Sequence, residues 1–122
     1  MSAYAIWIDH EEAKIFKFHE NRSEVIHVKE PSHTALNKGN QKHVDAEKFF
    51  HDVATKIGDA EEIFLCGPGL GKDHFKTHLE KHHHEKLAKK IVGMEAMDHP
   101  TDNQIRAGAR KFFRHFDLYA GI

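Results

Sequence analysis

The stretch that decides the fold runs from residue 63 to residue 72 and reads IFLCGPGLGK. Four apolar residues, Ile63 to Cys66, are followed at once by a turn rich in glycine and proline, which is typical of a buried strand that ends abruptly. The composition of residues 72–90 then favours helix, in two pieces joined near His82–His84. A strand followed by a helix and another strand indicates a parallel pair in an α/β sheet.

Three strands are predicted before this unit, over residues 3–9, 13–18 and 24–29, where apolar residues cluster or alternate. The connections between them are short, which predicts an antiparallel meander. After the unit, residues 91–97 predict the last strand.

Two further helices are indicated by apolar spacing. One carries Phe50, Val53, Ala54 and Ile57 at i, i+3, i+4 and i+7, and we expect Gly58 to end it. The other opens at Thr101, with Gln104 three residues later as in a capping box, and its apolar stripe is Ile105, Ala109, Phe112, Phe113 and Phe116. The order β-β-β-α-β-α-β-α predicts an α/β, ribonuclease-H-like fold, with a five-stranded mixed sheet and helices on its faces, as one domain over residues 1–122.

Composition excludes several classes. The single cysteine, Cys66, rules out a disulfide scaffold. No apolar stretch is long enough to span a bilayer, and the N-terminus lacks the pattern of a signal peptide. We therefore expect a cytoplasmic protein with no membrane association.

Charge is segregated along the chain although the net charge is only −1. Residues 45–62 hold six acids and two lysines. Residues 72–90 hold six lysines and three acids, and they also contain five histidines. Residues 101–117 add Arg106, Arg110, Lys111 and Arg114 against two acids. Basic faces of this kind are typical either of solvated helices or of proteins that bind a polyanion.

Two motifs resemble known sites, a phosphate-binding loop and a two-metal nuclease site, but match them incompletely. The glycine-rich turn does not match a phosphate loop, because the spacing to Lys72 is one residue short and Asp73 replaces the usual Ser or Thr. Asp9, Glu47 and Asp98 stand where a two-metal nuclease gathers carboxylates, but the fourth strand ends in Cys66.

The histidines offer a second metal hypothesis. His78 and His74 precede His82–His84 by one and two helical turns, respectively. This spacing can bind a metal, but no matching cysteine or carboxylate pattern accompanies it. A polar helix face explains them better, and we expect Cys66 to be a small buried hydrophobe. No metal and no cofactor are predicted.

Residues 66–75 and 83–93 resemble the middle domain of archaeal and eukaryotic class-1 peptide-chain release factors. In that family a strand ends in Gly-Gly-Pro-Gly, a Lys-x-x-Phe helix follows, and a Leu-x-x-Lys-Lys-Ile-(Ile/Leu)-Gly run leads into the last strand. Here the corresponding residues are Cys66 to Gly69, Lys72 with Phe75, and Leu87 to Gly93. Residues 8–15 are similar to the family's first hairpin.

The resemblance implies a role for the polar loop of residues 30–43, where the family carries Gly-Gly-Gln and Gly39-Asn40-Gln41 stands here. Gln41 would orient a water toward the peptidyl-tRNA ester, and Gly39 would provide the turn. Asn40 replaces the second glycine; it tolerates left-handed backbone but adds bulk. The RNA-facing lysines implied with it are Lys38, Lys42, Lys72, Lys76, Lys89 and Lys90.

The function implied is therefore translation-associated: binding of ribosomal RNA and the tRNA acceptor end, with peptidyl-tRNA hydrolysis in ribosome rescue as its enzymatic form. Among similar families, Vms-type peptidyl-tRNA-cleaving factors keep the glutamine in a different setting, whereas the middle domain of Pelota-type rescue factors lacks the motif and does not hydrolyse. The ribosome and tRNA are the expected partners. Because segments for decoding and for GTPase binding are not recognised in this sequence, we expect the chain to act at the ribosome either as a stand-alone middle domain or beside a protein partner that supplies ribosome targeting. Two alternatives stay open: a non-catalytic ribosome-binding module, and a divalent-metal nuclease using Asp9, Glu47 and Asp98.

Overall fold

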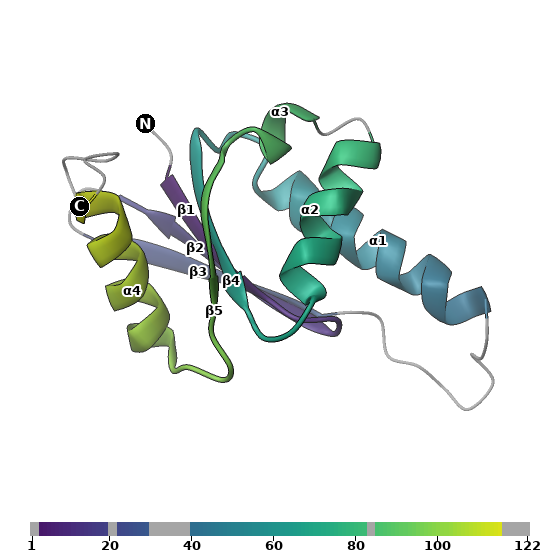
Figure 1. Cartoon of the computed structure of the whole chain (residues 1–122), viewed down its shortest axis with the longest axis horizontal. Coiled ribbons are helices and arrows are strands. Elements are labelled where there is room, and N and C mark those ends of the chain that lie inside the picture. Colours follow the sequence, from purple (N-terminus) through teal and green to yellow (C-terminus); the bar gives the residue numbers. More distant parts are fainter. Residues whose placement is uncertain (1–2, 20–21, 30–39, 83–84, 116–122) are drawn as a thin grey trace.

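The computed structural model describes residues 3–19, 22–29, 40–82 and 85–115, with the backbone alone at 40–45 and 115. Within these residues the chain forms five strands and four helices (Figure 1). They are β1 (Ala3–Ile8), β2 (Glu12–Phe18), β3 (Ser23–Lys29), α1 (Asn40–Lys56), β4 (Glu62–Gly67), α2 (Gly71–Lys81), α3 (Glu85–Ala88), β5 (Ile91–Ala96) and α4 (Asp102–His115). None of the described helices combines the length and the apolar character that crossing a membrane requires.

The sheet is mixed and five-stranded, in the order β3-β2-β1-β4-β5. The first three strands pair antiparallel through short connections, and β1, β4 and β5 pair parallel. Every residue of β1 is buried, as expected for a central strand covered on both faces. The predicted α/β class and the predicted mixed sheet are confirmed.

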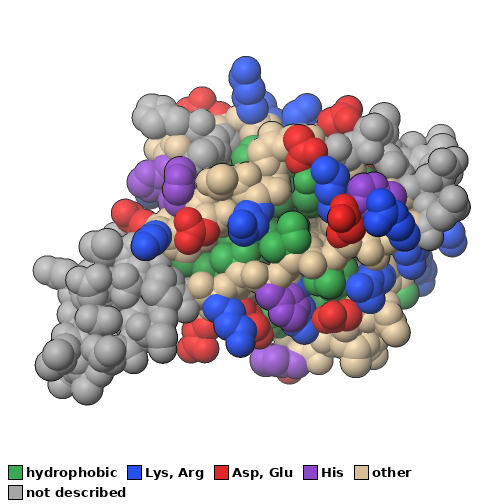
Figure 2. All heavy atoms as spheres, turned by 180° about the vertical axis from the view of Figure 1, so that it is seen from behind, with side chains coloured by type: hydrophobic (Ala, Val, Ile, Leu, Met, Phe, Trp, Pro, Cys, Tyr) green, Lys and Arg blue, Asp and Glu red, His purple; other side chains and the backbone are tan. Residues whose placement is uncertain are grey.

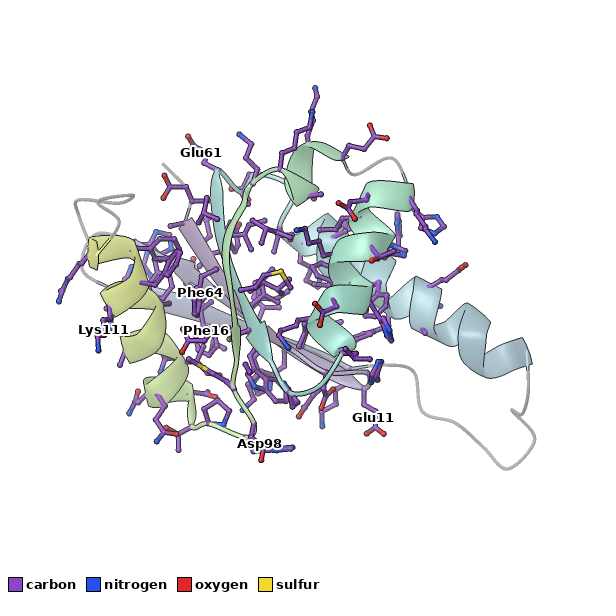
Figure 3. The ribbon with its side chains drawn as sticks, in the orientation of Figure 1. Glu11, Phe16, Glu61, Phe64, Asp98 and Lys111 are labelled. Carbon is purple, nitrogen blue, oxygen red and sulfur yellow. The ribbon has the colours of Figure 1, made fainter. Side chains whose placement is uncertain are left out.

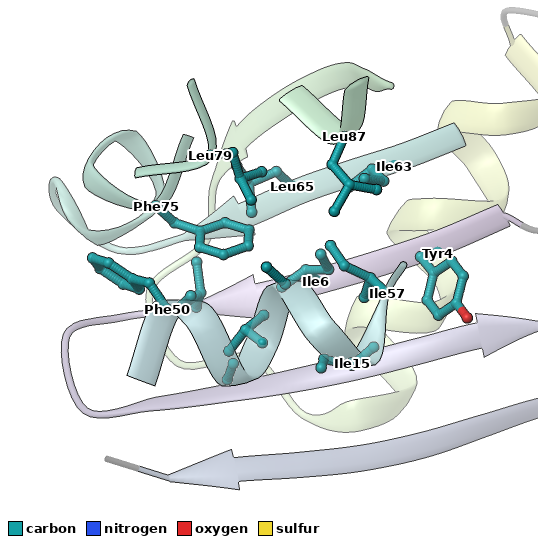
Figure 4. Close-up of a cluster of buried hydrophobic side chains, with 14 of the residues drawn as sticks. Tyr4, Ile6, Ile15, Phe50, Ile57, Ile63, Leu65, Phe75, Leu79 and Leu87 are labelled. Carbon is teal, nitrogen blue, oxygen red and sulfur yellow. The ribbon is translucent and has the colours of Figure 1, made fainter. Parts of the chain in front are cut away.

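One layer of helices, α1 to α3, covers the first face of the sheet. The predicted stripe of α1 is buried, and Phe50 packs against Phe75 of α2 with ring centroids 5.7 Å apart. Figure 4 shows these rings in one cluster with Ile6 and Leu65, which belong to β1 and β4. Each large apolar side chain buried here stabilises the fold by roughly 1.5–3 kcal/mol.

The second face is covered by α4 alone among the described helices. Ile105, Ala109 and Phe113 are fully buried against Phe64 and other side chains of β1, β2 and β4. The predicted capping box is present, because Thr101 N–H donates to Gln104 Oε1 and Gln104 N–H donates to Thr101 Oγ1. Phe116, the last residue of the predicted stripe, lies outside the described residues.

The start of the first helix differs from the sequence-based expectation. The polar loop predicted to reach residue 43 is shorter, since α1 already begins at Asn40. Glu47 consequently lies in the eighth position of α1 and does not open the helix. The early start carries no apolar signal, because the first apolar residue of the stripe is Phe50. The region 72–90 does divide into two helices, as predicted.

Candidate functional site

The parallel strands β1, β4 and β5 end together at one edge of the sheet, which we call the carboxyl edge. The turns that form it are residues 9–11, 68–70 and 97–101. The helices that follow β4 and β5 lie on opposite faces, an arrangement that opens a crevice for ligands in α/β sheets. Figure 3 shows Glu11 and Asp98 at this edge and Glu61 at the opposite one, the amino edge.

The glycine-rich turn is packed tightly against the end of β1. Gly67 has φ of +149°, and a Cβ built on it would lie 2.1 Å from the Ile8 carbonyl oxygen. A Cβ on Gly71 would lie 2.9 Å from the Asp9 backbone. Asp9 itself accepts the backbone N–H groups of Glu11 and Glu12, each at 2.8 Å. The glycines therefore serve close packing of a strand-to-helix turn.

Lys72 and Lys76 occupy the first two turns of α2, next to the carboxyl edge. The Lys72 ammonium donates to the Gly69 carbonyl at 2.7 Å and lies 3.8 Å from the Asp73 carboxylate, so its charge is tied to the turn. Close by, the His10 and His74 rings meet, with 3.0 Å between Nε2 and Nδ1. This edge thus combines two lysines with two imidazoles drawn from separate elements.

Lys89 and Lys90 lie at the amino edge, just before β5. The Lys90 carbonyl accepts the Ile63 N–H at 2.8 Å, which places this pair beside the acidic segment 59–62. A six-residue strand such as β4 spans about 20 Å, so these lysines are separated from Lys72 by about that length. The structure therefore divides these four predicted RNA-binding lysines between two opposite edges.

Only some of the catalytic residues predicted from the resemblance lie within the residues that the structure describes. Gly39 and Lys38 lie outside the described residues. Asn40, Gln41 and Lys42 form the first turn of α1, where backbone N–H groups have no intrahelical acceptor. No acidic residue occupies this first turn. In Figure 1, the beginning of α1 extends past α2, away from α4.

A metal site is not assembled in the part of the chain that the structure describes, where no group of three or more His, Cys, Asp or Glu side chains has suitable geometry. Asp9 is engaged in its own turn, and Asp98 pairs with its neighbour His99 at 3.1 Å. His78 is buried beside Phe50 and stacks on His82 at 4.4 Å, as a packed side chain does.

Cys66 is buried, as predicted. Burial, and secondarily the Glu95 carboxylate, raises the pKa of its thiol to about 12. A thiol with that pKa is protonated at neutral pH and is a poor nucleophile.

Sequence reasoning recognised the basic residues of α4 but not how they are held. The Arg106 guanidinium lies 5.1 Å from the Phe16 ring centroid, and that of Arg110 lies 5.5 Å from the Phe18 centroid. Both rings belong to β2, about ninety residues earlier in the chain. Spacing along α4 gives no indication of such a contact, which depends on the packing of the helix across the sheet.

No family model and no curated protein sequence matches this chain. Solved structures do. The Pelota protein of Thermoplasma acidophilum matches with a TM-score of 0.61 at 16% identity, over 93% of this chain and 31% of that one. The Archaeoglobus fulgidus Pelota gives 0.59 at 16%, over 96% and 34%, and the archaeal translation termination factor aRF1 gives 0.59 at 14%, over 96% and 40%.

The chain thus spans only about a third to two fifths of the length of these relatives. At this identity the likeness concerns the fold. In fold, it confirms the resemblance inferred from residues 66–75 and 83–93 and is consistent with a middle domain of such factors. The chain therefore has the fold that Pelota and archaeal release-factor structures contain within a part of their length.

Proposed function

We propose that this chain is a translation-associated RNA-binding protein that meets the acceptor end of tRNA on the ribosome. The support is the fold, shared over 93–96% of the chain with two Pelota proteins and with an archaeal translation termination factor. The start of α1 is the surface that we assign to the tRNA.

The observation that carries this assignment is the chemistry of the first turn of α1. A helix of 17 residues presents partial positive charge and unpaired N–H groups at its beginning. With no acid in that turn and Lys42 within it, the turn favours an anion such as a phosphate. Its location at the outer end of the molecule suits insertion into a crowded RNA cavity (Figure 1).

Co-sedimentation with ribosomes at increasing salt tests the proposal. RNA binding through phosphate contacts weakens steeply as salt rises, because bound counterions are released on association. We expect the protein to pellet with ribosomes at low salt and to dissociate progressively. Failure to pellet at low salt would remove the proposal and leave only the fold.

Hydrolysis of peptidyl-tRNA is the second candidate, favoured by the place of Gln41 in that same turn. Its side chain would orient the attacking water, and its backbone N–H would stabilise the developing oxyanion. Release of labelled peptide from ribosome-bound peptidyl-tRNA measures the activity. Loss of release in Gln41→Ala, with unchanged sedimentation, would identify a hydrolase; no release by the unmodified chain would identify a non-catalytic binding module.

A further inference from the structure

The outer side of α4 carries four basic residues, which we call the α4 basic face: Arg106, Arg110, Lys111 and Arg114. Ala107, Arg110, Lys111 and Arg114 line a hollow along this side of the helix. Figure 3 shows Lys111 projecting away from the sheet, while Phe16 and Phe64 lie between α4 and the strands. Lys111 and Arg114 are exposed, whereas Arg106 and Arg110 are half-buried beside the rings of β2.

Little on α4 itself opposes this charge. Its only acid among the described residues is Asp102, at the first position, and the Lys14 ammonium pairs with it at 3.1 Å. Arg106 donates to two neutral oxygens, Ser23 Oγ at 2.8 Å and Asn103 Oδ1 at 3.0 Å. Figure 2 shows Lys and Arg side chains gathered on the side of the molecule that carries α4.

Two of the three guanidinium groups are also held in place before any ligand arrives. Arg106 and Arg110 rest on the rings of Phe16 and Phe18, which restricts their rotamers. A side chain that is already ordered loses less entropy when it binds. Arginine, which supplies three of the four cations, presents a planar fork that matches phosphate oxygens.

The repeat along the helix suits a strand of phosphates. Arg106, Arg110 and Arg114 follow one another at intervals of four residues, which correspond to about 6 Å along an α-helix. Charges at such a regular interval favour a polyanion over a single bound anion.

We infer that the α4 basic face is a second RNA-binding surface, which contacts the phosphate backbone of a separate RNA segment. It lies on the opposite face of the sheet from α1, so the chain would contact RNA on two sides. The inference adds to the proposed function by naming a further contact, and it rests on that function only in taking RNA as the partner.

Binding of labelled unacylated tRNA over a range of salt concentrations tests this inference. We compare the unmodified chain with a triple variant, Arg110→Gln, Lys111→Gln and Arg114→Gln. Each lost phosphate contact lowers the slope of log affinity against log salt by about 0.7–0.9, so we expect a fall of about 2 to 3. The matched control removes three exposed lysines elsewhere, with Lys29→Gln, Lys48→Gln and Lys56→Gln.

An equal fall in the control would overturn the inference, because net charge alone would then explain the effect. An unchanged slope in the triple variant, with tRNA still bound, would overturn it while leaving the proposed function intact. No tRNA binding by the unmodified chain would instead contradict both.

A fallback double variant and an acidic probe are added to this experiment. If the triple variant does not unfold cooperatively on heating, the double variant Lys111→Gln and Arg114→Gln replaces it, with an expected fall in slope of about 1.5. Polyglutamate serves as the acidic-protein probe. Loss of polyglutamate binding in the variant, with the tRNA slope unchanged, would assign the face to an acidic protein partner and refute the RNA assignment.

Discussion

Lys72 and Lys76 lie beside the carboxyl edge, whereas Lys89 and Lys90 lie at the amino edge, about 20 Å away along β4. The first pair is half-buried at the start of α2, near the imidazoles of His10 and His74. The second pair is exposed, next to the acidic segment 59–62. Residues that share a type and a basic stretch of sequence are therefore placed in different surroundings, and we expect them to differ in RNA binding.

The largest difference between the two edges should appear in the stability lost when a glycine is replaced by alanine. Gly67→Ala introduces a Cβ that collides with the Ile8 carbonyl at a positive φ, so we expect a loss of about 3 kcal/mol or more in the free energy of unfolding. Gly58→Ala, near the amino edge, meets only Thr55 O at 3.6 Å and should change stability by less than about 1 kcal/mol. Denaturant titration measures both, and equal effects would contradict the tight packing described for the carboxyl edge.

The next difference concerns RNA. Neutralising the carboxyl-edge pair with Lys72→Gln and Lys76→Gln should lower the salt slope of tRNA binding by about 1.5. The same change at Lys89 and Lys90 should lower the slope by less than about 0.7, which is the value for one phosphate contact. The reason is that the carboxylates of segment 59–62 already weaken the positive potential at the amino edge. A larger effect of the amino-edge pair would reverse the comparison. Thermal unfolding of each variant controls for the bond from Lys72 to Gly69.

The smallest effects should come from two carboxyl groups at the amino edge whose pKa values are shifted in opposite directions. The hydrogen bond from Tyr4, followed by that from Lys17, lowers the pKa of Asp59. Because the folded pKa lies below the unfolded one, Asp59 stabilises the fold above the usual value near 3.8, and this contribution is lost as pH falls. Asp59→Asn should therefore destabilise at pH 7 by less than about 1 kcal/mol, with the difference vanishing in acid.

Glu62 should show the reverse sign. Burial, and secondarily Glu61, raises the pKa of Glu62, so its ionised form is disfavoured in the folded state at neutral pH. Glu62→Gln should then stabilise slightly at pH 7 and have less effect near pH 3. Unfolding free energies measured across this range for both variants check the pair. Parallel pH profiles would show that the two environments do not differ as described.

The sequence predicts most of the fold because its signals are local. The buried run of Ile63–Cys66, the stripe that includes Phe50 and Ile57, and the reciprocal cap of Thr101 and Gln104 each depend on neighbours within one or two turns. The beginning of α1 at Asn40 was not predicted, since a polar first turn has no apolar periodicity to reveal it.

The surfaces were harder to predict than the fold. That Lys90 lies beside segment 59–62 follows from the pairing of β4 with β5, which composition does not encode. The stacking of Arg106 on Phe16 joins residues ninety positions apart. Such contacts arise only when helices pack across a sheet, so a basic stretch in the sequence indicates charge without indicating which face carries it.

Contact between the first turn of α1 and the acceptor end of tRNA can be measured by removing that end. Affinity is measured for intact tRNA and for tRNA lacking its 3′-terminal nucleotides, with the unmodified chain and with Gln41→Ala. We predict that removing the 3′ end of the tRNA lowers its affinity for the unmodified chain. The same removal should change its affinity for the Gln41→Ala variant only slightly. Equal affinity of the unmodified chain for intact and shortened tRNA would contradict it.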